Sequence, residues 1–511
     1  MEIVNIYSED KLMDDIYKNS IQYADTSLHM SKKTIGQFFT PLSIANYMSD
    51  MSTIKNESIS ILDAGAGSGI LSVSLVCKLV RDGVKKIDLV LYEIDQRIIE
   101  LLDYNMVLLR DYCLSKDVNL KYFINNDNFI LTNKDAWKGD ISGYFDIVIG
   151  NPPYMKIGKG SQESIVMSNV VSGQPNLYFL FMALSAKLLK EGGELIYIVP
   201  RSFTSGLYFK KFRRWFLNVM SITNLHLFES RNNVFQDANI LQETIIIRAI
   251  KEKRNDMISI TSSDCSVHNE ISIVKVDREV CISKDENNYI FIPTSDLEVD
   301  IIKTVSSFKN VLQDFGLVAK TGIVVPFRNV AYMSNDIGDN TIPMLWSYNI
   351  YNNDIKFPLH IESKPQYLYD NNDSKKYRMI LGNYLLMKRM TAKEEKRRLQ
   401  CAVLEKQYFK DAHYFTTENH INYITRINGN LSKSEVYGLF VWFNTSIMDK
   451  YFRLLNGSTQ VNSSELNSIP IPDYDFLIDM GEKAAAAPYL YRDESSCDKL
   501  FFSALSRRKT A

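Results

Sequence analysis

Residues 145–156, FDIVIGNPPYMK, place an amide, two prolines and an aromatic ring directly after a run rich in β-branched residues. Neither proline has a backbone N–H group, so the strand predicted over residues 144–150 ends here. The side chain of Asn151 and the main chain of Pro152 each offer a carbonyl oxygen that accepts hydrogen bonds. Two acceptors on a rigid turn suit an –NH₂ group with two hydrogens to donate, and Tyr154 offers a flat face for stacking. The stretch predicts a site for a planar ring with an exocyclic amine.

Such an amine is a weak nucleophile, because its lone pair is delocalised into the ring. Accepting both of its hydrogens favours the tetrahedral nitrogen that develops during attack. The two carbonyl groups would therefore stabilise the transition state more than the ground state. If the donor is already activated, the transfer needs no metal ion and no covalent intermediate. We therefore predict group transfer to a ring amine and no metal site.

Three acidic residues follow other predicted strands in the same half of the chain. Asp63 opens the glycine-rich stretch DAGAGSG, in which glycines let the backbone approach a ligand closely. Glu93 ends the next strand, where a carboxylate can accept two ribose hydroxyls. Asp127 is suited to bind an adenine amine while Phe129 covers the ring. Because the carboxyl ends of parallel strands meet at one edge of an open sheet, we expect these residues and NPPY to line one site.

Each of these features also has a purely structural interpretation. A glycine-rich turn, a solvated acid at a strand end and an Asn-Asp-Asn turn all occur without ligands. DAGAGSG is not a Walker A loop, since no Gly-Lys-Ser/Thr follows it. The separation of Asp63 and Glu93 also exceeds the ~20 residues of a dinucleotide fingerprint. It is the combination of strand-end residues that indicates a nucleotide-like ligand.

Short apolar runs alternate with amphipathic stretches from residue 58 to about residue 250. The sequence predicts strands at 58–65, 86–95, 144–150, 194–200 and 241–250, and helices at 70–83, 96–113 and 176–193. Strands that alternate with helices indicate an α/β fold with a mostly parallel sheet and helices on both faces.

Composition narrows the class of protein without identifying a partner. The 511 residues include 45% hydrophobic and 23% charged residues, and the formal net charge is −1. These are ordinary values for a globular protein. Six scattered cysteines lack the spacing of a zinc site or a disulfide framework, which favours a reduced, cytoplasmic protein. No signal peptide or membrane span is predicted, because no apolar run approaches ~18 residues.

The motifs of residues 30–250 resemble, in their order, those of the TaqI-type (γ class) DNA adenine-N6 methyltransferases. The matching stretches are GQFFTP, DAGAGSG, YEID, NDNF, FDIVIGNPPY, NLYFLF and GGELIYIVP. The resemblance implies S-adenosylmethionine as the methyl donor, double-stranded DNA as the substrate and a Rossmann-like methyltransferase sheet. It also implies that the adenine is flipped out of the duplex, because a base stacked at the sheet edge cannot remain paired.

The resemblance assigns cofactor contacts to the residues that match the family motifs. They are Thr40, Pro41, Asp63, Ala64, Gly65, Gly67, Glu93, Ile94, Asp127, Phe129, Asn151 and Phe181. Thr40 and Pro41 would lie beside the methionine moiety and Glu93 would hold the ribose. Ile94 and Phe181 would contact the adenine of the cofactor.

The resemblance also implies which residues contact the target base. This sequence departs from the family motif at one position. Tyr154 would stack on one face of the target adenine and Phe235 on the other. Phe235 also fits an ordinary hydrophobic position in a loop. Where the family commonly has Asp-Phe, this chain has Asn128 between Asp127 and Phe129. Either Asn128 or Phe129 would therefore cover the cofactor adenine.

Sequence specificity is expected from the C-terminal part of the chain. Residues 320–329 and 454–472 resemble target-recognition segments of the subgroup with the PstI, BsuBI and PaeR7I modification enzymes. Independently, residues 371–410 carry an excess of seven positive charges, and residues 210–215 are KKFRRW. Such residues would neutralise phosphates, although a solvated charged face fits the region around residues 393–398 equally well. The candidate DNA contacts are Lys210, Lys211, Arg213, Arg214, Lys388, Arg389, Gln460 and Asn462, with the last two facing adenine edges.

We predict four segments. Residues 1–250 form the methyltransferase catalytic domain with an N-terminal helical segment, and residues 251–300 form connecting strands. Residues 301–475 form an α+β target-recognition domain, and residues 476–511 form a helical tail. The segment between NPPY and NLYF, residues 156–176, is rich in glycine and serine and is predicted to order over bound DNA.

Three other functions remain open. NPPY also occurs in enzymes that methylate RNA bases or protein glutamines. A fused restriction-modification enzyme is a second possibility, although the Pro-Asp and Glu-Lys pairs within residues 472–483 lack the E-x-K spacing of a nuclease. A catalytically silent DNA-binding subunit is the third. The motif order and the large C-terminal region favour a DNA methyltransferase that is the modification partner of a restriction endonuclease. We expect it in the bacterial cytoplasm, and a monomer is adequate for this function.

Overall fold

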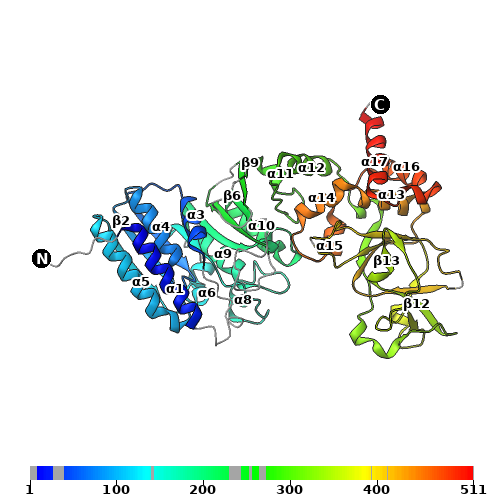
Figure 1. Cartoon of the computed structure of the whole chain (residues 1–511), viewed down its shortest axis with the longest axis horizontal. Coiled ribbons are helices and arrows are strands. Elements are labelled where there is room, and N and C mark those ends of the chain that lie inside the picture. Colours follow the sequence, from blue (N-terminus) through cyan, green and yellow to red (C-terminus); the bar gives the residue numbers. More distant parts are fainter. Residues whose placement is uncertain are drawn as a thin grey trace. The chain divides into compact units, whose positions relative to one another are not determined.

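The chain forms two compact units, Met1–Asp296 and Leu297–Ala511. The computed structural model describes residues 8–26, 40–139, 143–228, 243–252, 256–263, 272–392, 394–410 and 412–509. Figure 1 gives the order of the elements along the chain. No helix within these ranges is both long and apolar enough to cross a membrane.

The first unit is built on a nine-stranded sheet with the order β3-β2-β1-β4-β5-β7-β6-β8-β9. Its parallel strands are β1 (Ser58–Ala64), β2 (Lys86–Tyr92), β3 (Asn119–Asn125), β4 (Phe145–Gly150) and β5 (Leu189–Pro200). The register pairs Ala64 with Tyr92 and Tyr92 with Asn125, so β1, β2 and β3 end level at one edge. The predicted α/β fold with a mostly parallel sheet is confirmed.

Four further strands complete this sheet beyond β5. They are β6 (Ser221–Phe228), β7 (Thr244–Ile250), β8 (Met257–Ser263) and β9 (Ser272–Asp277). β7 lies antiparallel between β5 and β6, and β8 pairs in parallel with β6. Residues 251–300 were expected to connect two domains, but β8 and β9 belong to the sheet and the unit ends at Asp296. The reason is that β8 satisfies the main-chain groups that β6 would otherwise leave unpaired.

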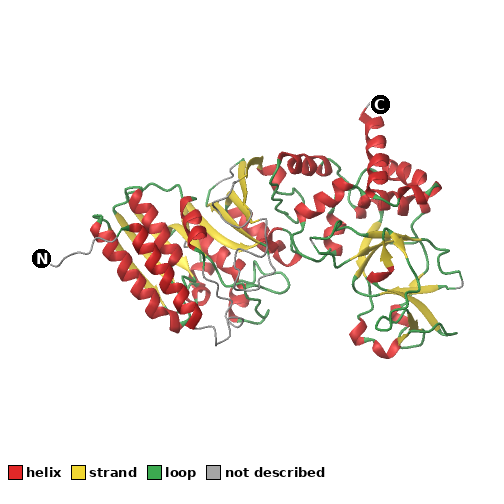
Figure 2. Ribbon diagram, in the orientation of Figure 1, coloured by secondary structure: helices red, strands yellow, loops and turns green. Residues whose placement is uncertain are grey.

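Helices cover both faces of the sheet, as predicted (Figure 2). α1 (Glu9–Thr26), α4 (Ile70–Arg81) and α5 (Gln96–Ser115) lie side by side with α3 (Leu42–Asp50) next to α4. They share one core with alternate strand residues such as Ile196 and Ile198. The intervening Tyr197 points the other way and bonds to Ser185 of α9 (Leu177–Leu188), which packs against α10 (Lys210–Val219).

Short helices occupy the connections of the first unit. They are α6 (Phe129–Thr132), α7 (Lys134–Lys138), α8 (Gln162–Val166) and α11 (Arg278–Cys281). α8 lies within the glycine- and serine-rich segment of residues 156–176, which was predicted to become ordered over bound DNA. The ends of that segment are tied together by a bridge between Lys156 and Asn176.

The second unit is an α+β structure, as the sequence predicted. One sheet has the order β10 (Leu317–Thr321), β20 (Ile421–Arg426), β17 (Tyr384–Lys388), β18 (Cys401–Leu404). The other has the order β11 (Met333–Ser334), β15 (Tyr367–Tyr369), β12 (Thr341–Leu345), β19 (Tyr414–Thr417), β16 (Met379–Ile380). A short pair is formed by β13 (Ile350–Tyr351) and β14 (Asp354–Ile355).

Helices complete the second unit. They are α12 (Asp296–Ser306), α13 (Lys433–Asn444), α14 (Ser446–Leu455), α15 (Ser463–Ser468), α16 (Tyr474–Ala486) and α17 (Glu494–Lys509). A Cβ on Gly481 would lie 1.8 Å from the carbonyl oxygen of Ser434, so glycine allows α16 to approach α13. Residues 476–511 are thus part of this unit rather than a separate tail. α13 and α14 are separated at Thr445, whose side chain caps α14.

Candidate cofactor and transfer site

The turn after β1 leaves open space beside its main chain. Gly65 and Gly67 have φ angles of +82° and +56°, a region that side chains with a Cβ rarely adopt. The N–H groups of Gly65 and Ala66 donate to the carbonyl of Tyr92 at 2.8 and 2.9 Å, which ties the turn to the end of β2. A Cβ at Gly67 would meet no atom within 4 Å. The turn is therefore held firmly from one side and accessible from the other.

A buried carboxylate and an exposed apolar side chain stand together at the end of β2. The carboxylate of Glu93, 4% exposed, accepts hydrogen bonds from the N–H groups of Gly67 at 2.9 Å and Asp95 at 2.8 Å. Burial raises the pKa of Glu93, and these bonds partly offset that effect. The neighbouring Ile94 is 60% exposed. Glu93 thus shapes the glycine turn, while Ile94 offers an apolar surface to a ligand.

Asp63 carries an unsatisfied acceptor. Its side chain is fully buried, and Oδ2 accepts a hydrogen bond from the Ser72 hydroxyl at 2.7 Å. Oδ1 has no hydrogen-bond partner within the described ranges. Burial raises the pKa of Asp63 to about 7, the Ser72 bond opposes the rise, and the charge of Glu93 adds to it. A buried acceptor without a donor is costly unless a ligand supplies the donor.

Replacing Asp63 with asparagine is expected to flatten the pH dependence of stability of the ligand-free protein. Because the folded-state pKa of about 7 lies above the ordinary 3.8, protonated Asp63 stabilises the fold below about pH 4, and this contribution is lost as the pH rises through about 7. One pKa unit corresponds to about 1.4 kcal/mol. Urea denaturation of wild type and Asp63→Asn at several pH values measures the difference. Parallel pH profiles for the two proteins would contradict the expectation.

Two phenylalanine rings meet beside the glycine turn. The ring centres of Phe129 and Phe181 are 5.1 Å apart, and a Cβ at Gly65 would lie 3.9 Å from Phe181. Asn128 instead begins α6, where its side chain accepts from the N–H groups of the next turn and donates to Glu163 at 2.9 Å. The structure therefore gives Asn128 a capping role and places Phe129 with Phe181. Asp127, by contrast, is exposed at the end of β3.

The NPPY turn lies at the same edge of the sheet. Nδ2 of Asn151 donates to the hydroxyl of the buried Thr40 at 3.2 Å, which fixes the plane of the amide. The hydroxyl of Tyr154 donates to the carbonyl of Ile198 at 3.0 Å, which fixes the orientation of the ring. The adjoining Pro153 would lie 3.9 Å from a Cβ at Gly65. The expected transfer residues and the expected cofactor turn are thus adjacent.

Some of the remaining predicted site residues lie at this edge, and others lie outside the described residues. Pro41 precedes α3, Ala64 ends β1 and Pro152 is buried within the turn. Phe235, expected on the second face of the target base, lies outside the described residues, as do the first four residues of GQFFTP.

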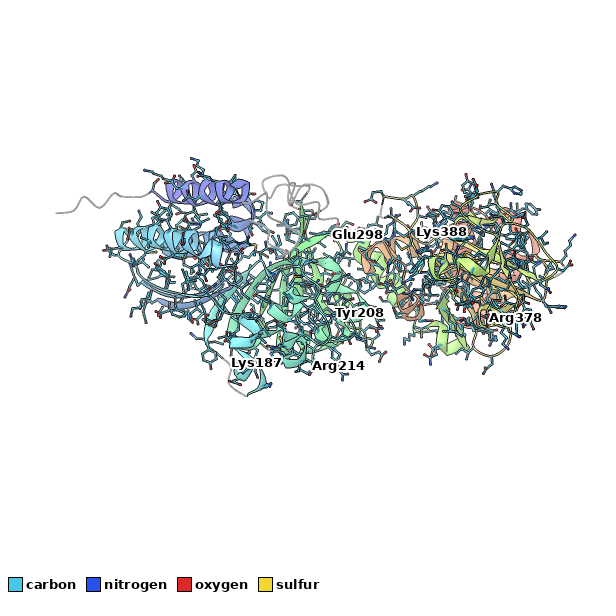
Figure 3. The ribbon with its side chains drawn as sticks, turned by 90° about the horizontal axis from the view of Figure 1, so that it is seen from below. Lys187, Tyr208, Arg214, Glu298, Arg378 and Lys388 are labelled. Atoms are coloured by element: carbon cyan, nitrogen blue, oxygen red, sulfur yellow. The ribbon has the colours of Figure 1, made fainter. Side chains whose placement is uncertain are left out.

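The basic cluster in the first unit is only partly available to DNA. Arg213, expected to contact DNA, is 1% exposed and donates to the carbonyls of Phe203, Gly206 and Asn287 at 2.8–2.9 Å. It is a structural residue, because its charge is already satisfied inside the fold. Lys210 forms an ion pair with Glu286 at 2.6 Å. Lys211 and Arg214 are exposed, and Figure 3 shows Arg214.

The basic cluster in the second unit, within residues 371–410, also contains arginines that are buried and therefore not available to DNA. Arg398 is fully buried and donates to Thr391 at 3.1 Å and to the carbonyl of Ser458 at 2.6 Å. Arg397 is also buried and donates to the carbonyl of Phe443 at 3.1 Å. The sequence left two interpretations of this charge run open, phosphate contacts or a solvated face, and both would place its arginines at the surface. The apolar run that follows it and forms β18 was the available signal that this part of the chain enters the core.

The four DNA contacts expected in this unit are Lys388, Arg389, Gln460 and Asn462. Burial lowers the pKa of Lys388, and Arg389 donates to the carbonyl of Asn419 at 3.1 Å. Gln460 is exposed. Asn462 begins α15, and its N–H donates to Glu465 at 3.1 Å.

Comparison with known proteins places the chain among modification enzymes. The family model described as Eco57I restriction-modification methylase matches residues 14–235. The type II methyltransferase M.BsuBI of Bacillus subtilis is 32% identical over 458 residues, which are 88% of this chain and 90% of that protein. The type II methyltransferase M.PstI of Providencia stuartii is 32% identical over 482 residues, with 92% and 93% covered.

Solved structures show the same fold at low sequence identity. A DrdV–DNA complex has a TM-score of 0.51 and 11% identity, and the match covers 94% of this chain and 60% of that chain. A nuclease-deletion mutant of the type ISP enzyme LlaGI, in complex with a DNA substrate mimic, has a TM-score of 0.51 and 12% identity, with 93% and 56% covered.

Proposed function

We propose a function for this chain, which belongs to the type II DNA methyltransferases of restriction-modification systems, the family of M.BsuBI and M.PstI. It transfers a methyl group from S-adenosylmethionine to N6 of an adenine flipped out of double-stranded DNA. The observation that carries this proposal is the adjacency of NPPY to the glycine turn. Pro153 and Phe181 both lie within van der Waals distance of the position that a Cβ on Gly65 would take.

The residues at the sheet edge fit S-adenosylmethionine. The unsatisfied Oδ1 of Asp63 suits a donor that a cationic ligand brings, and the open space at Gly67 suits close approach of a ligand to the main chain. Glu93 would accept ribose hydroxyls, and Asp127 would accept the adenine amine. The exposed Ile94 and the pair of Phe129 and Phe181 would contact the adenine. When bound, the cofactor supplies a methyl group activated on a sulfonium.

The chain itself would position the nucleophile. The carbonyls of Asn151 and Pro152 accept the two hydrogens of the adenine amine and so favour the tetrahedral nitrogen of the transition state. Thr40 holds the Asn151 amide, and Ile198 holds the Tyr154 ring against which the base stacks. Flipping the base costs a few kcal/mol, and stacking with these hydrogen bonds offsets that cost.

Replacing Ile94 with alanine is expected to weaken S-adenosylmethionine binding by roughly five- to tenfold, because a buried contact of ~1 kcal/mol with adenine is lost. The stability of the free protein should not change, since Ile94 is already 60% exposed. Isothermal titration calorimetry measures the affinity. Leu114→Ala, at a side chain 69% exposed in the same unit, is the matched control. Equal affinities for the two variants would remove Ile94 from the cofactor site.

The proposal is tested by incubating the protein with methyl-labelled S-adenosylmethionine and equal amounts of duplex DNA, RNA or glutamine-containing protein. Label should enter DNA alone, and nucleoside analysis should recover N6-methyladenine. Label in RNA or protein only would overturn the proposal, and N4-methylcytosine would overturn the choice of base. A restriction endonuclease that reads the same site would be the functional partner in a bacterial cytoplasm. A monomer is adequate, because each strand can be modified in a separate event.

A further inference from the structure

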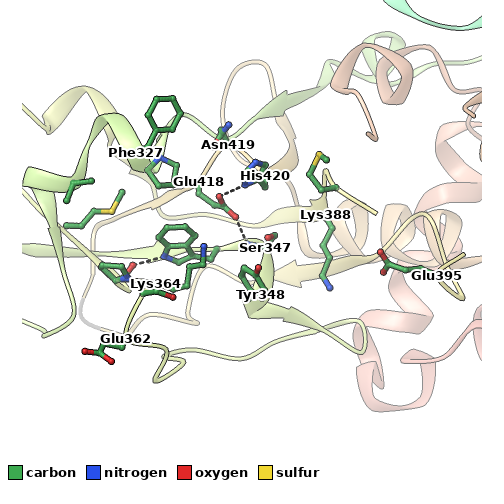
Figure 4. A pocket seen from close by; sticks show the side chains of 17 residues that line it. Phe327, Ser347, Tyr348, Glu362, Lys364, Lys388, Glu395, Glu418, Asn419 and His420 are labelled. Carbon is green, nitrogen blue, oxygen red and sulfur yellow. Dashed lines mark hydrogen bonds and ion pairs between the residues drawn. The ribbon is translucent and has the colours of Figure 1, made fainter. Parts of the chain in front are cut away.

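The second unit contains a cavity of about 890 Å³ formed entirely by its own residues (Figure 4). Its walls come from five separate stretches: residues 326–333, 346–348, 362–365, 388–390 together with Glu395, and 418–420. The side chains of Phe327 and Tyr348 on these walls are 76% and 57% exposed. An open cavity with exposed aromatic rings indicates a binding surface rather than a packing defect.

One wall carries an imidazole with a fixed orientation. Glu418 is 1% exposed, and its carboxylate accepts from the N–H of Ser347 at 2.9 Å and from Nδ1 of His420 at 2.8 Å. A carboxylate only accepts, so Nδ1 carries the hydrogen and the other ring nitrogen, Nε2, is left as the outer polar atom. The side chain of His420 is 49% exposed. A buried acid thus positions an exposed imidazole for contact with a ligand.

The turn that carries His420 is rigid. The N–H of Asn419 donates to the carbonyl of Val324, and the N–H of Arg389 donates to the carbonyl of His420, both at 2.8 Å. A Cβ at Gly322 would lie 2.0 Å from the carbonyl oxygen of Glu418, so glycine is required beneath the turn. These main-chain groups are satisfied by neighbouring segments. In the described part of the chain, Oδ1 of Asn419 is a buried acceptor without a hydrogen-bond partner.

The charges of the cavity favour neutral bases over phosphates. The charged residues that line it are two lysines, Lys364 and Lys388, and three acids, Glu362, Glu395 and Glu418. A phosphate site needs an excess of positive charge, which this cavity lacks. Donors, acceptors and flat aromatic faces together suit the edges of nucleobases and the methyl group of thymine. Gln460, expected from the sequence to face adenine, pairs by a β-bridge with Met390 on the wall.

We propose that this cavity is where the second unit contacts base edges of the recognition sequence. His420 and Asn419 are specificity-determining residues, and Glu418 is the residue that positions His420. Nε2 of His420 accepts a hydrogen from a base amino group, and the Nδ2 group of Asn419 donates to a base acceptor such as a purine N7. This inference rests on the proposed function, because it assigns the base-reading surface of the same enzyme.

The test begins with modification-sensitive sequencing of DNA methylated by the wild-type protein, which gives the sequence context. Duplex oligonucleotides with that site, and with each single base-pair change, then serve as substrates for wild type, His420→Ala, Asn419→Ala and His413→Ala. His413 is exposed in the same unit but lies outside the cavity, so His413→Ala is the matched control. His420→Gln keeps a polar side chain and separates loss of recognition from loss of folding.

His420→Ala should lower kcat/KM on the wild-type site by roughly 10- to 100-fold. Discrimination at one base pair should also be lost, while His413→Ala behaves as wild type. The dependence of DNA affinity on salt should not change, since no phosphate contact is removed. A uniform loss on all sequences with a shallower salt dependence would make His420 a phosphate contact and overturn the proposal. Unchanged context and rate in both cavity variants would also overturn it. Wild-type protein that modifies no DNA would instead overturn the proposed function.

Discussion

Replacing Asn151 with alanine is expected to lower kcat for DNA methylation by roughly 100- to 1,000-fold, the usual effect of deleting one preorganised polar group that stabilises a transition state. Under the proposed function the variant would keep Pro152 and the stacking ring of Tyr154, but the adenine amine would lose one of its two acceptors. Its lone pair then stays delocalised into the ring, and the nitrogen attacks more slowly. The hydroxyl of Thr40, which accepts from the Asn151 amide at 3.2 Å, would lose this donor.

Single-turnover methylation of a duplex that contains the site measures this effect. Asn119→Ala, at an exposed position at the start of β3, is the control and is expected to retain wild-type kcat. DNA affinity and the thermal midpoint of Asn151→Ala should stay close to wild type, because the loss falls on the chemical step. An Asn151→Ala protein with more than about a tenth of the wild-type rate would contradict the assigned role.

Arg398→Met is expected to reduce the free energy of unfolding of the second unit by about 3 kcal/mol, the cost of breaking a buried charged network from one side. The guanidinium is fully buried and donates to Thr391 and to the carbonyl of Ser458. Its positive charge also lowers the pKa of Glu465, which burial raises to about 6. Methionine fills a similar volume but leaves these acceptors without their donor.

Hydrogen exchange of the α14 amides measures the loss in the second unit, since unfolding of a two-unit protein is not a single transition. Lys396→Met removes an exposed positive charge two residues away and should leave exchange unchanged. If Arg398→Met kept full protection but weakened DNA binding with a shallower salt dependence, Arg398 would be a phosphate contact after all. That result would restore the interpretation of residues 393–398 as a DNA-binding run.

Much of the transfer site was predictable because its signals are local. Two prolines end a strand wherever they occur, and three closely spaced glycines permit a tight turn at positive φ. Alternating strand and helix periods then imply a parallel sheet whose carboxyl ends meet at one edge. Asp63, Glu93 and Asn151 were therefore expected at that edge from the sequence, and the structure places them there.

Local composition did not predict which charged residues are buried and which are exposed. Arg213 and Arg214 are adjacent and chemically identical, yet one is 1% exposed and the other faces solvent. Lys396 and Arg398 differ in the same way. Burial depends on which distant carbonyl groups surround a side chain, and a charge run gives no information on that.

The sequence by itself determined the class of fold, the order of the sheet-edge residues and the chemistry that their side chains support. Only the tertiary structure decided that Asn128 caps a helix while Phe129 joins Phe181, and that β8 and β9 extend the sheet. It alone assembled the cavity around His420 from five distant stretches. The physical reason is that turns, caps and periodicity act over a few residues, whereas burial, pairing and cavities depend on contacts between residues far apart in the chain.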